Sequence, residues 1–211
     1  MSLNSPYCYW YFNEVLTHKF CDDVIQRGNE EKENVALTGK FENKSEDTLT
    51  EEQINDLKTR RDSNIAWLSD DWIYRTVHPF IHQANKNAGW NFDWNFTEAC
   101  QFTKYKINQY YNWHCDSWDK PYDRPDDLNF HEKMRKLSVS CQLTDSSEYE
   151  GGELEFQPRD CEDPGLIVPC KEARKKGSII VFPSHIYHRV KPVTKGTRYS
   201  LVMWNLGLPF K

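Results

Sequence analysis

The sequence predicts a single domain that is mainly β, with helices in its N-terminal part. The chain has 211 residues and a mass of 25.1 kDa, a size that suits one domain. Aromatic residues make up 14% of the chain and can bury large areas in a core. Beyond about residue 90, short aromatic and β-branched runs alternate with turn residues, which is typical of an all-β sandwich or barrel. The expected strands lie at residues 95–105, 137–144, 152–156, 165–169, 178–182, 188–192 and 198–206.

Helical patterns occupy the first part of the chain. Apolar residues at helical spacing predict a helix over residues 16–27, with Gly28 as its terminator. Thr50 and Gln53 fit a capping box, in which each side chain accepts a hydrogen bond from the other residue's backbone N–H. A second, short helix is therefore expected to begin just after Thr50.

A third helical pattern covers residues 64–87, whose apolar residues form one broad side. Pro79 lies inside this pattern and is expected to kink or divide the helix, because proline lacks the N–H that the helix needs. These patterns together predict that residues 1–90 form a helical support for a β core at residues 91–211. Both parts are assigned to one domain over residues 1–211.

Charge and composition exclude several classes of protein. The net charge of −5 and the pI of about 5.8 give no general attraction to polyphosphate, so nucleic acid is not an expected partner. The short basic run at residues 171–176 contains a glutamate and is interpreted as a solvated loop. No stretch approaches the roughly 18 apolar residues of a membrane helix, so no membrane association is expected.

The cysteines and the N-terminus indicate a cytoplasmic protein. The seven cysteines are odd in number and include no C-x-x-C pair, which favours reduced thiols over a disulfide framework. The first residues lack the basic segment and apolar run of a signal peptide.

The segment at residues 116–135 is long, polar and proline-containing, and we expect a mobile loop there. Two interpretations stay open, a plain surface excursion and a lid over a binding site. The aromatic side chains of Trp118, Tyr122 and Phe130 favour the lid, because full exposure of three large rings is costly.

Three residues form a candidate metal site. His114 and Asp116 are two residues apart, and in an extended strand such residues point to the same face. His188 follows 72 residues after Asp116, at the end of the run SIIVFPSHIYHRV. Two imidazoles and one carboxylate suit a non-haem Fe(II) oxygenase, because they leave coordination positions open. His185 is a rival to His188, but its position three residues earlier predicts the opposite face.

Arg198 begins the last predicted strand, ten residues after His188. An inward-facing guanidinium can hold a carboxylate with two parallel charge-assisted hydrogen bonds. The sequence therefore places a candidate anion clamp near the candidate metal site.

The block from Tyr105 to Trp204 resembles the prolyl-4-hydroxylase-like branch of the 2-oxoglutarate- and Fe(II)-dependent oxygenases. The resemblance rests on the ordered stretches YKINQYYNWHCD, LSVSCQLTDSSEYEGGELEF and GSIIVFPSHIYHRVKPVTKGTRYSLVMW, which cover about half of the chain. It implies a double-stranded β-helix, the cupin-like jelly-roll of two sheets whose mouth holds the iron.

The resemblance also implies residue roles. His114, Asp116 and His188 match the three iron ligands, and Arg198 matches the residue that pairs with the C5 carboxylate of 2-oxoglutarate.

Four further residues match positions around the cosubstrate. Tyr105 matches a tyrosine that hydrogen-bonds 2-oxoglutarate, Tyr111 lines the same pocket, and Ser200 is a candidate donor to the cosubstrate carboxylate. Trp204 matches an aromatic wall beside the iron. For the three aromatic residues, a purely structural role in the core stays open.

The activity that the resemblance implies is hydroxylation of a C–H bond with Fe(II), 2-oxoglutarate and O2, and ascorbate (vitamin C) is expected as a supporting reductant. A prolyl residue in a peptide or protein is the first candidate substrate, and a free amino acid or other small molecule is the second. A non-catalytic jelly-roll that binds metal is a remote alternative. Asp116 favours hydroxylation over halogenation, because related halogenases have a small residue at this position.

Overall fold

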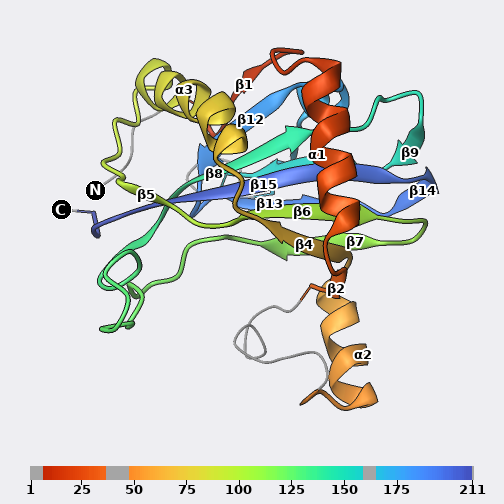
Figure 1. The fold of residues 1–211 in the computed structure, drawn as a ribbon, viewed down its shortest axis with the longest axis horizontal. Coiled ribbons are helices and arrows are strands. Elements are labelled where there is room, and N and C mark those ends of the chain that lie inside the picture. Colours follow the sequence, from red (N-terminus) through yellow and green to blue (C-terminus); the bar gives the residue numbers. More distant parts are fainter. Residues whose placement is uncertain (1–6, 37–47, 159–164, 211) are drawn as a thin grey trace.

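Two antiparallel sheets form the jelly-roll of the computed structural model, which describes residues 7–36, 48–158 and 165–210 (Figure 1). Within these residues the larger sheet has eight strands, the smaller has five, and a ribbon has two. Across the larger sheet the strands are β1 (Trp10–Phe12), β12 (Ile179–Pro183), β8 (Met134–Gln142), β15 (Arg198–Gly207), β6 (Cys100–Tyr105), β4 (Asn64–Leu68) and β2 (Asn34–Val35), with β5 (Phe96–Thr97) paired to β15. The smaller sheet contains β11 (Val168–Pro169), β10 (Leu154–Gln157), β13 (Tyr187–Val190), β7 (Tyr110–His114) and β3 (Arg61–Asp62), and the ribbon pairs β14 (Val193–Gly196) with β9 (Tyr149–Gly151).

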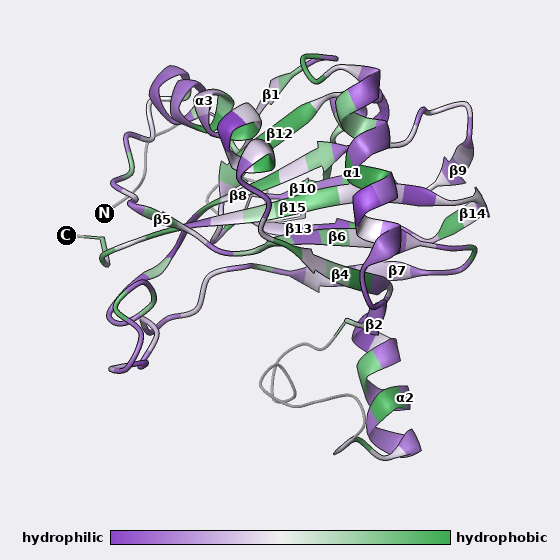
Figure 2. Ribbon diagram, in the orientation of Figure 1, coloured by the Kyte–Doolittle hydropathy of each residue, from purple (hydrophilic) through white to green (hydrophobic). Residues whose placement is uncertain are grey.

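The described helices are α1 (His18–Glu30), α2 (Glu51–Arg60) and α3 (Asp71–Asn87), with a short 3-10 helix, η3 (Lys171–Arg174). Helix α1 packs against β4 and β6, whereas α3 packs against β1 and β12. Figure 1 shows α2 projecting away from the sheets. Both α1 and α3 carry hydrophobic as well as hydrophilic residues (Figure 2), as expected for helices that bury one face against a sheet.

The larger sheet is buried on both faces, and strand β12 shows why. Ile179 and Val181 join the core between the helices and the larger sheet. Ile180 and Phe182 join the second core, which lies between the two sheets. Successive side chains of a strand point to opposite faces, so one short apolar strand contributes to both cores. The second core adjoins the candidate site.

The helix predicted over residues 64–87 is wrong at its start. Residues Asn64–Leu68 form strand β4, which pairs with β6 and β2 in the larger sheet. Helix α3 begins only at Asp71, and Pro79 lies inside it without dividing it. A run of five residues is too short for periodicity to separate strand from helix, and pairing with β6 decides the outcome. The first 90 residues therefore supply strands as well as helices.

Two predictions about helix ends had different outcomes. The capping box is confirmed, because Thr50 Oγ1 accepts from Gln53 N at 3.3 Å and Gln53 Oε1 accepts from Thr50 N at 3.1 Å. The prediction that Gly28 terminates the first helix is wrong, since α1 continues to Glu30. Gly28 is buried at the contact with Phe102, and a Cβ on this residue would lie 2.3 Å from the Phe102 ring.

Replacing Gly28 by alanine is therefore expected to destabilise the fold, although alanine is the better helix former. The added methyl group would force the buried Phe102 ring out of position, and overpacking of this kind costs about 1–3 kcal/mol. Urea unfolding of Gly28→Ala measures the loss, with Asn29→Ala on the exposed side of α1 as the control. An unchanged free energy of unfolding in Gly28→Ala would contradict this close packing.

The predicted strands appear with shifted ends. Residues 95–105 form two strands, β5 and β6, rather than one. Strands β7, β9 and β14 were not predicted. The described cysteines are all free thiols, and Cys161 lies outside the described residues. Among the described helices, none has the length and apolar composition to cross a membrane.

Candidate metal centre

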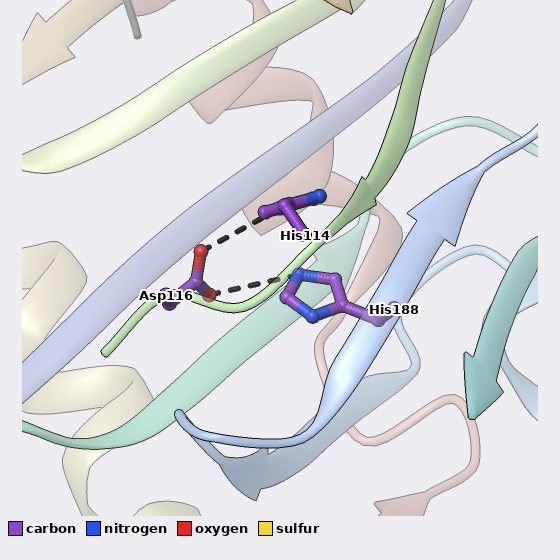
Figure 3. A group of neighbouring side chains, drawn as sticks. All are labelled: His114, Asp116 and His188. Carbon is purple, nitrogen blue, oxygen red and sulfur yellow. Dashed lines mark ion pairs between the residues drawn. The ribbon is translucent and has the colours of Figure 1, made fainter. Parts of the chain in front are cut away.

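His114, Asp116 and His188 meet at one point between neighbouring strands of the smaller sheet (Figure 3). His114 is the last residue of β7, and His188 lies on β13. The two histidines are directly opposite each other in the antiparallel pair, which brings their side chains together on one face. Their ring centroids are 4.1 Å apart.

Asp116 reaches the site by a different route from the one its spacing predicts. Strand β7 ends at His114, so Asp116 does not belong to the same extended strand. Instead, the backbone N–H groups of Asp116 and Ser117 both donate to Ser184 O, at 2.8 and 3.0 Å. Ser138 Oγ on β8 donates to Asp116 Oδ2 at 2.7 Å and contacts Ser184 Oγ at 2.9 Å. The carboxylate is thus fixed by two segments that are distant in sequence.

The donor atoms of the three side chains converge. His114 Nε2 lies 3.6 Å from Asp116 Oδ1, and His188 Nε2 lies 3.6 Å from Asp116 Oδ2. All three candidate ligand atoms lie within 4.8 Å of one another. Ligand bonds from imidazole and carboxylate groups to a first-row metal are about 2.0–2.2 Å long. One ion between these atoms could therefore be bound by all three residues.

The hydrogen bonds of both imidazoles orient the nitrogens that are the candidate metal ligands. His114 Nδ1 contacts Asn112 O at 2.8 Å, and His188 Nδ1 contacts Ile186 O at 3.0 Å. A carbonyl oxygen only accepts, so Nδ1 carries the proton in each ring and donates it. Nε2 of each ring then has a free lone pair directed toward Asp116, which is the arrangement that metal-binding histidines use.

The electrostatics of the site favour the metal-binding protonation states. Burial and the neighbouring His188 hold the pKa of His114 well below its usual value, against the opposing effect of Asp116. Burial alone would raise the pKa of Asp116, but His188, His114, Arg135 and the Ser138 hydrogen bond lower it to about 2. At neutral pH, His114 is therefore neutral and Asp116 is ionised, as metal binding requires. Two imidazoles and one carboxylate with positions left open form the facial triad of non-haem iron oxygenases.

Arg198 lies in the pocket that contains this triad. The pocket holds about 440 Å³ of space, part of it open to solvent. Arg198 begins β15 opposite Tyr105 of β6, and only 2% of its surface is exposed. Its Nε has no hydrogen-bond partner, and no ion pair within the described residues includes Arg198. A buried cation without an acid is unfavourable, so the pocket is suited to a ligand that brings its own carboxylate. A diacid such as 2-oxoglutarate fits this requirement.

The four other predicted site residues line the same pocket: Tyr105, Tyr111, Ser200 and Trp204. Tyr111 stacks on His114 with ring centroids 3.4 Å apart and planes at 11°, so it supports a candidate metal ligand. Trp204 Nε1 is buried without a hydrogen-bond partner among the described residues. The roles of these four side chains toward a cosubstrate stay predictions.

Two residues that the sequence did not indicate belong to the site, Arg61 in the pocket and Ser138 beside Asp116. Arg61 is buried, its guanidinium lies 4.5 Å from the Tyr111 ring centroid, and it bonds Ser63 Oγ at 2.8 Å and Gln101 Oε1 at 3.5 Å. Ser138 is the hydrogen-bond donor to the carboxylate of the triad. Neither residue lies near the H-x-D motif in sequence, and only the pairing of the strands brings them to it.

Ser138→Ala is expected to weaken metal binding about 10- to 100-fold, because the donor that orients and stabilises the Asp116 carboxylate is lost. Anaerobic titration with Fe(II) measures the change, and Ser146→Ala in an exposed turn is the matched control. If Ser138→Ala binds Fe(II) as tightly as the wild type, the hydrogen bond has no part in building the site.

The fold and the site together define a class of protein: a jelly-roll with a two-histidine, one-carboxylate triad at its mouth and a buried arginine in the same pocket. The family model of the 2OG-Fe(II) oxygenase superfamily matches residues 100–205, which include all of the predicted site residues. The chain belongs to this superfamily.

Relatives among curated proteins carry the name PKHD-type hydroxylase. One from Synechococcus sp. (strain CC9902) is 35% identical over 100 residues, which span 47% of this chain and 37% of that protein. Another, from Aliarcobacter butzleri (strain RM4018), is 28% identical over 189 residues, covering 87% of this chain and 66% of that protein. The chain thus spans well under half of the Synechococcus relative and about two thirds of the Aliarcobacter one.

Solved structures share the fold. A Pseudomonas putida prolyl-4-hydroxylase superposes with a TM-score of 0.63 at 18% identity, covering 95% of this chain and 92% of that one. A Trichoplax adhaerens prolyl hydroxylase in complex with a hypoxia inducible factor peptide fragment gives a TM-score of 0.67 at 17% identity, covering 95% and 84%. At these identities the likeness establishes a common jelly-roll architecture and nothing finer.

Proposed function

We propose that this protein is a 2-oxoglutarate- and Fe(II)-dependent dioxygenase that hydroxylates a C–H bond. The observation that carries the proposal is the shared pocket, in which a buried arginine without an acid partner accompanies a His-Asp-His triad. Neither feature alone specifies a cosubstrate. Together they provide a metal site and a separate carboxylate site, which is what chelation of a 2-oxo diacid requires.

The residues divide the work between holding the metal and holding the cosubstrate. His114, Asp116 and His188 would hold the iron on one side and leave its other positions to cosubstrate and O2. Arg198 would hold the far carboxylate of 2-oxoglutarate with charge-assisted hydrogen bonds. When bound, iron and 2-oxoglutarate would supply the oxidising chemistry, in which 2-oxoglutarate, O2 and a substrate with a C–H bond give succinate, CO2 and the substrate with a hydroxyl group in place of that hydrogen. The protein positions the target carbon and limits access of water.

A prolyl residue in a peptide or protein is the substrate that we favour. It is supported by the hydroxylase names of the relatives and by structural neighbours that are prolyl hydroxylases, one of them with a peptide. The loop after Asp116 supports it too, because its Trp118 is linked to the pocket residue Trp204 through Arg135. Trp118 packs on Tyr122, and Arg135 lies with its guanidinium 5.0 Å from the Trp118 ring and 3.9 Å from the pocket residue Trp204. Such a loop could cover an extended peptide.

The test is turnover with a panel of proline-containing peptides in the presence of Fe(II), 2-oxoglutarate and O2. We expect peptide-stimulated succinate formation and a mass increase of one oxygen on a proline. The second candidate, a free amino acid or another small molecule, would give stimulation by that compound and none by peptides. Stimulation by neither class, with Fe(II) bound but 2-oxoglutarate never consumed, would point to a non-catalytic metal-binding jelly-roll.

Two further properties belong to the same proposal. The described cysteines are free thiols, which supports a reducing compartment such as the cytoplasm. Ascorbate is proposed as a supporting reductant, and its requirement is tested by comparing turnover with and without it.

A further inference from the structure

A second pocket lies at the C-terminal end of β15, away from the triad. It is formed by residues 91–95, residues 207–210 and Lys136 of β8, and it holds about 820 Å³ of space that opens to solvent. Figure 1 shows this end of β15 beside β5. Within the described part of the chain, the two pockets share no lining residue.

Lys136 is a buried cation that forms no ion pair with an acid of the described residues. Only 3% of its surface is exposed, although it lines the pocket. Its Nζ lies 3.3 Å from the centroid of the Phe210 ring, and within the described residues it takes part in no ion pair or side-chain hydrogen bond. Burial lowers the pKa of Lys136 to about 8, against the opposing effect of Asp93. The ammonium is therefore still largely protonated at neutral pH, and among the described residues Asp93 acts on it without forming an ion pair.

The lining of this pocket has an aromatic part and a polar part. Phe92 and Phe210 pack edge to face with centroids 4.9 Å apart, and Trp94 and Leu208 lie beside them, while Asn91, Asp93 and Asn95 form the polar part. Leu208 and Phe210 are 58% and 45% exposed, so the pocket has an apolar rim as well. Large exposed apolar side chains around a hollow are typical of a ligand site.

The chemistry of the lining selects among anions. A strongly hydrated ion such as phosphate would have to lose water against the aromatic walls without gaining apolar contacts, whereas the repulsion from the exposed carboxylate of Asp93 acts on every anion and does not distinguish among them. A carboxylate on an aromatic or aliphatic body satisfies both parts of the pocket, because its charge pairs with Lys136 and its body covers the rings.

We propose that this pocket binds a small organic acid, with Lys136 Nζ as the charge partner of its carboxylate and with Phe92, Trp94 and Phe210 around its apolar body. The proposal is independent of the oxygenase function, since it uses none of the residues that surround the triad.

Phenylacetate and its neutral analogue phenylacetamide are suitable probes for the full-length chain. Backbone amide NMR signals of Gly207 and Leu208 report on this pocket directly, without metal or turnover. We expect phenylacetate to shift these signals saturably and phenylacetamide to bind at least about tenfold more weakly, because the charge-assisted contact is lost.

A lysine variant tests the same contact by changing the protein instead of the ligand. Lys136→Met keeps roughly the length of the side chain and removes its charge. We expect this variant to bind phenylacetate at least about tenfold more weakly than the wild type. Lys86→Met, at an exposed position of α3, should leave binding unchanged. Any of three results would overturn the proposal. Phenylacetate could cause no saturable shifts, phenylacetamide could bind as tightly as phenylacetate, or Lys136→Met could bind phenylacetate as tightly as the wild type. The comparison of acid and amide needs only wild-type protein, so it stands even if the variant does not fold.

Discussion

Replacement of His188 by alanine is expected to remove Fe(II) binding and to reduce turnover by more than about 100-fold. Loss of a partner that merely orients a metal ligand already costs about 10- to 100-fold, so loss of the ligand itself should cost more. His188 supplies one of three converging donor atoms, and its Nδ1 is already committed to Ile186 O. Anaerobic Fe(II) titration and 2-oxoglutarate consumption measure the two effects.

His185 provides a matched control for this experiment. It lies three residues before His188, and it is not among the side chains that could hold a metal in the described residues. His185→Ala is therefore expected to retain Fe(II) binding. If His185→Ala lost the metal and His188→Ala kept it, the assignment of the ligands would be reversed.

Replacement of Arg198 by methionine is expected to raise the KM for 2-oxoglutarate at least about 30-fold. Truncating one partner of a buried charge pair costs about 2–5 kcal/mol, and each 1.4 kcal/mol corresponds to a factor of ten. Because the triad remains, Fe(II) binding should be unchanged and turnover should partly recover at high cosubstrate concentration. Steady-state kinetics with varied 2-oxoglutarate, together with Fe(II) titration, separates these effects.

The stability of the unliganded protein gives a second readout for Arg198. In the absence of cosubstrate the guanidinium is buried without an acid partner among the described residues. Arg198→Met should therefore leave the free energy of unfolding unchanged or raise it, while cosubstrate binding falls. A variant that loses stability and keeps its KM would show that Arg198 serves the fold rather than the cosubstrate.

The sequence predicted which side chains meet better than the way in which they are held. The H-x-D motif alone was a weak signal, and the resemblance to a known family predicted the convergence of His114, Asp116, His188 and Arg198, which the structure brings to one pocket. The strand argument for Asp116 was wrong, because hydrogen bonds to Ser184 and from Ser138 hold it beyond the end of β7. Contacts between segments that are distant in sequence cannot be predicted from a pattern of neighbouring residues.

The fold was predictable where the pattern was local. The capping box at Thr50 needs only four consecutive residues, and it is present as predicted. Residues Asn64–Leu68 were misassigned because their conformation depends on pairing with β6. Gly28 was misread because its role comes from the approach of Phe102, which is remote in sequence. Arg61 was missed for the same reason, since only strand pairing brings it to Tyr111.

The most direct test of the account is anaerobic absorption spectroscopy of the protein with Fe(II) and 2-oxoglutarate together. Chelation of Fe(II) by the 2-oxo acid inside the pocket should give a visible charge-transfer band that neither component gives with the protein alone. We predict the band in the wild type, its absence in His188→Ala, and its appearance in Arg198→Met only at much higher 2-oxoglutarate concentrations. A band of equal strength at equal concentrations in all three proteins would contradict binding of iron and cosubstrate in this pocket.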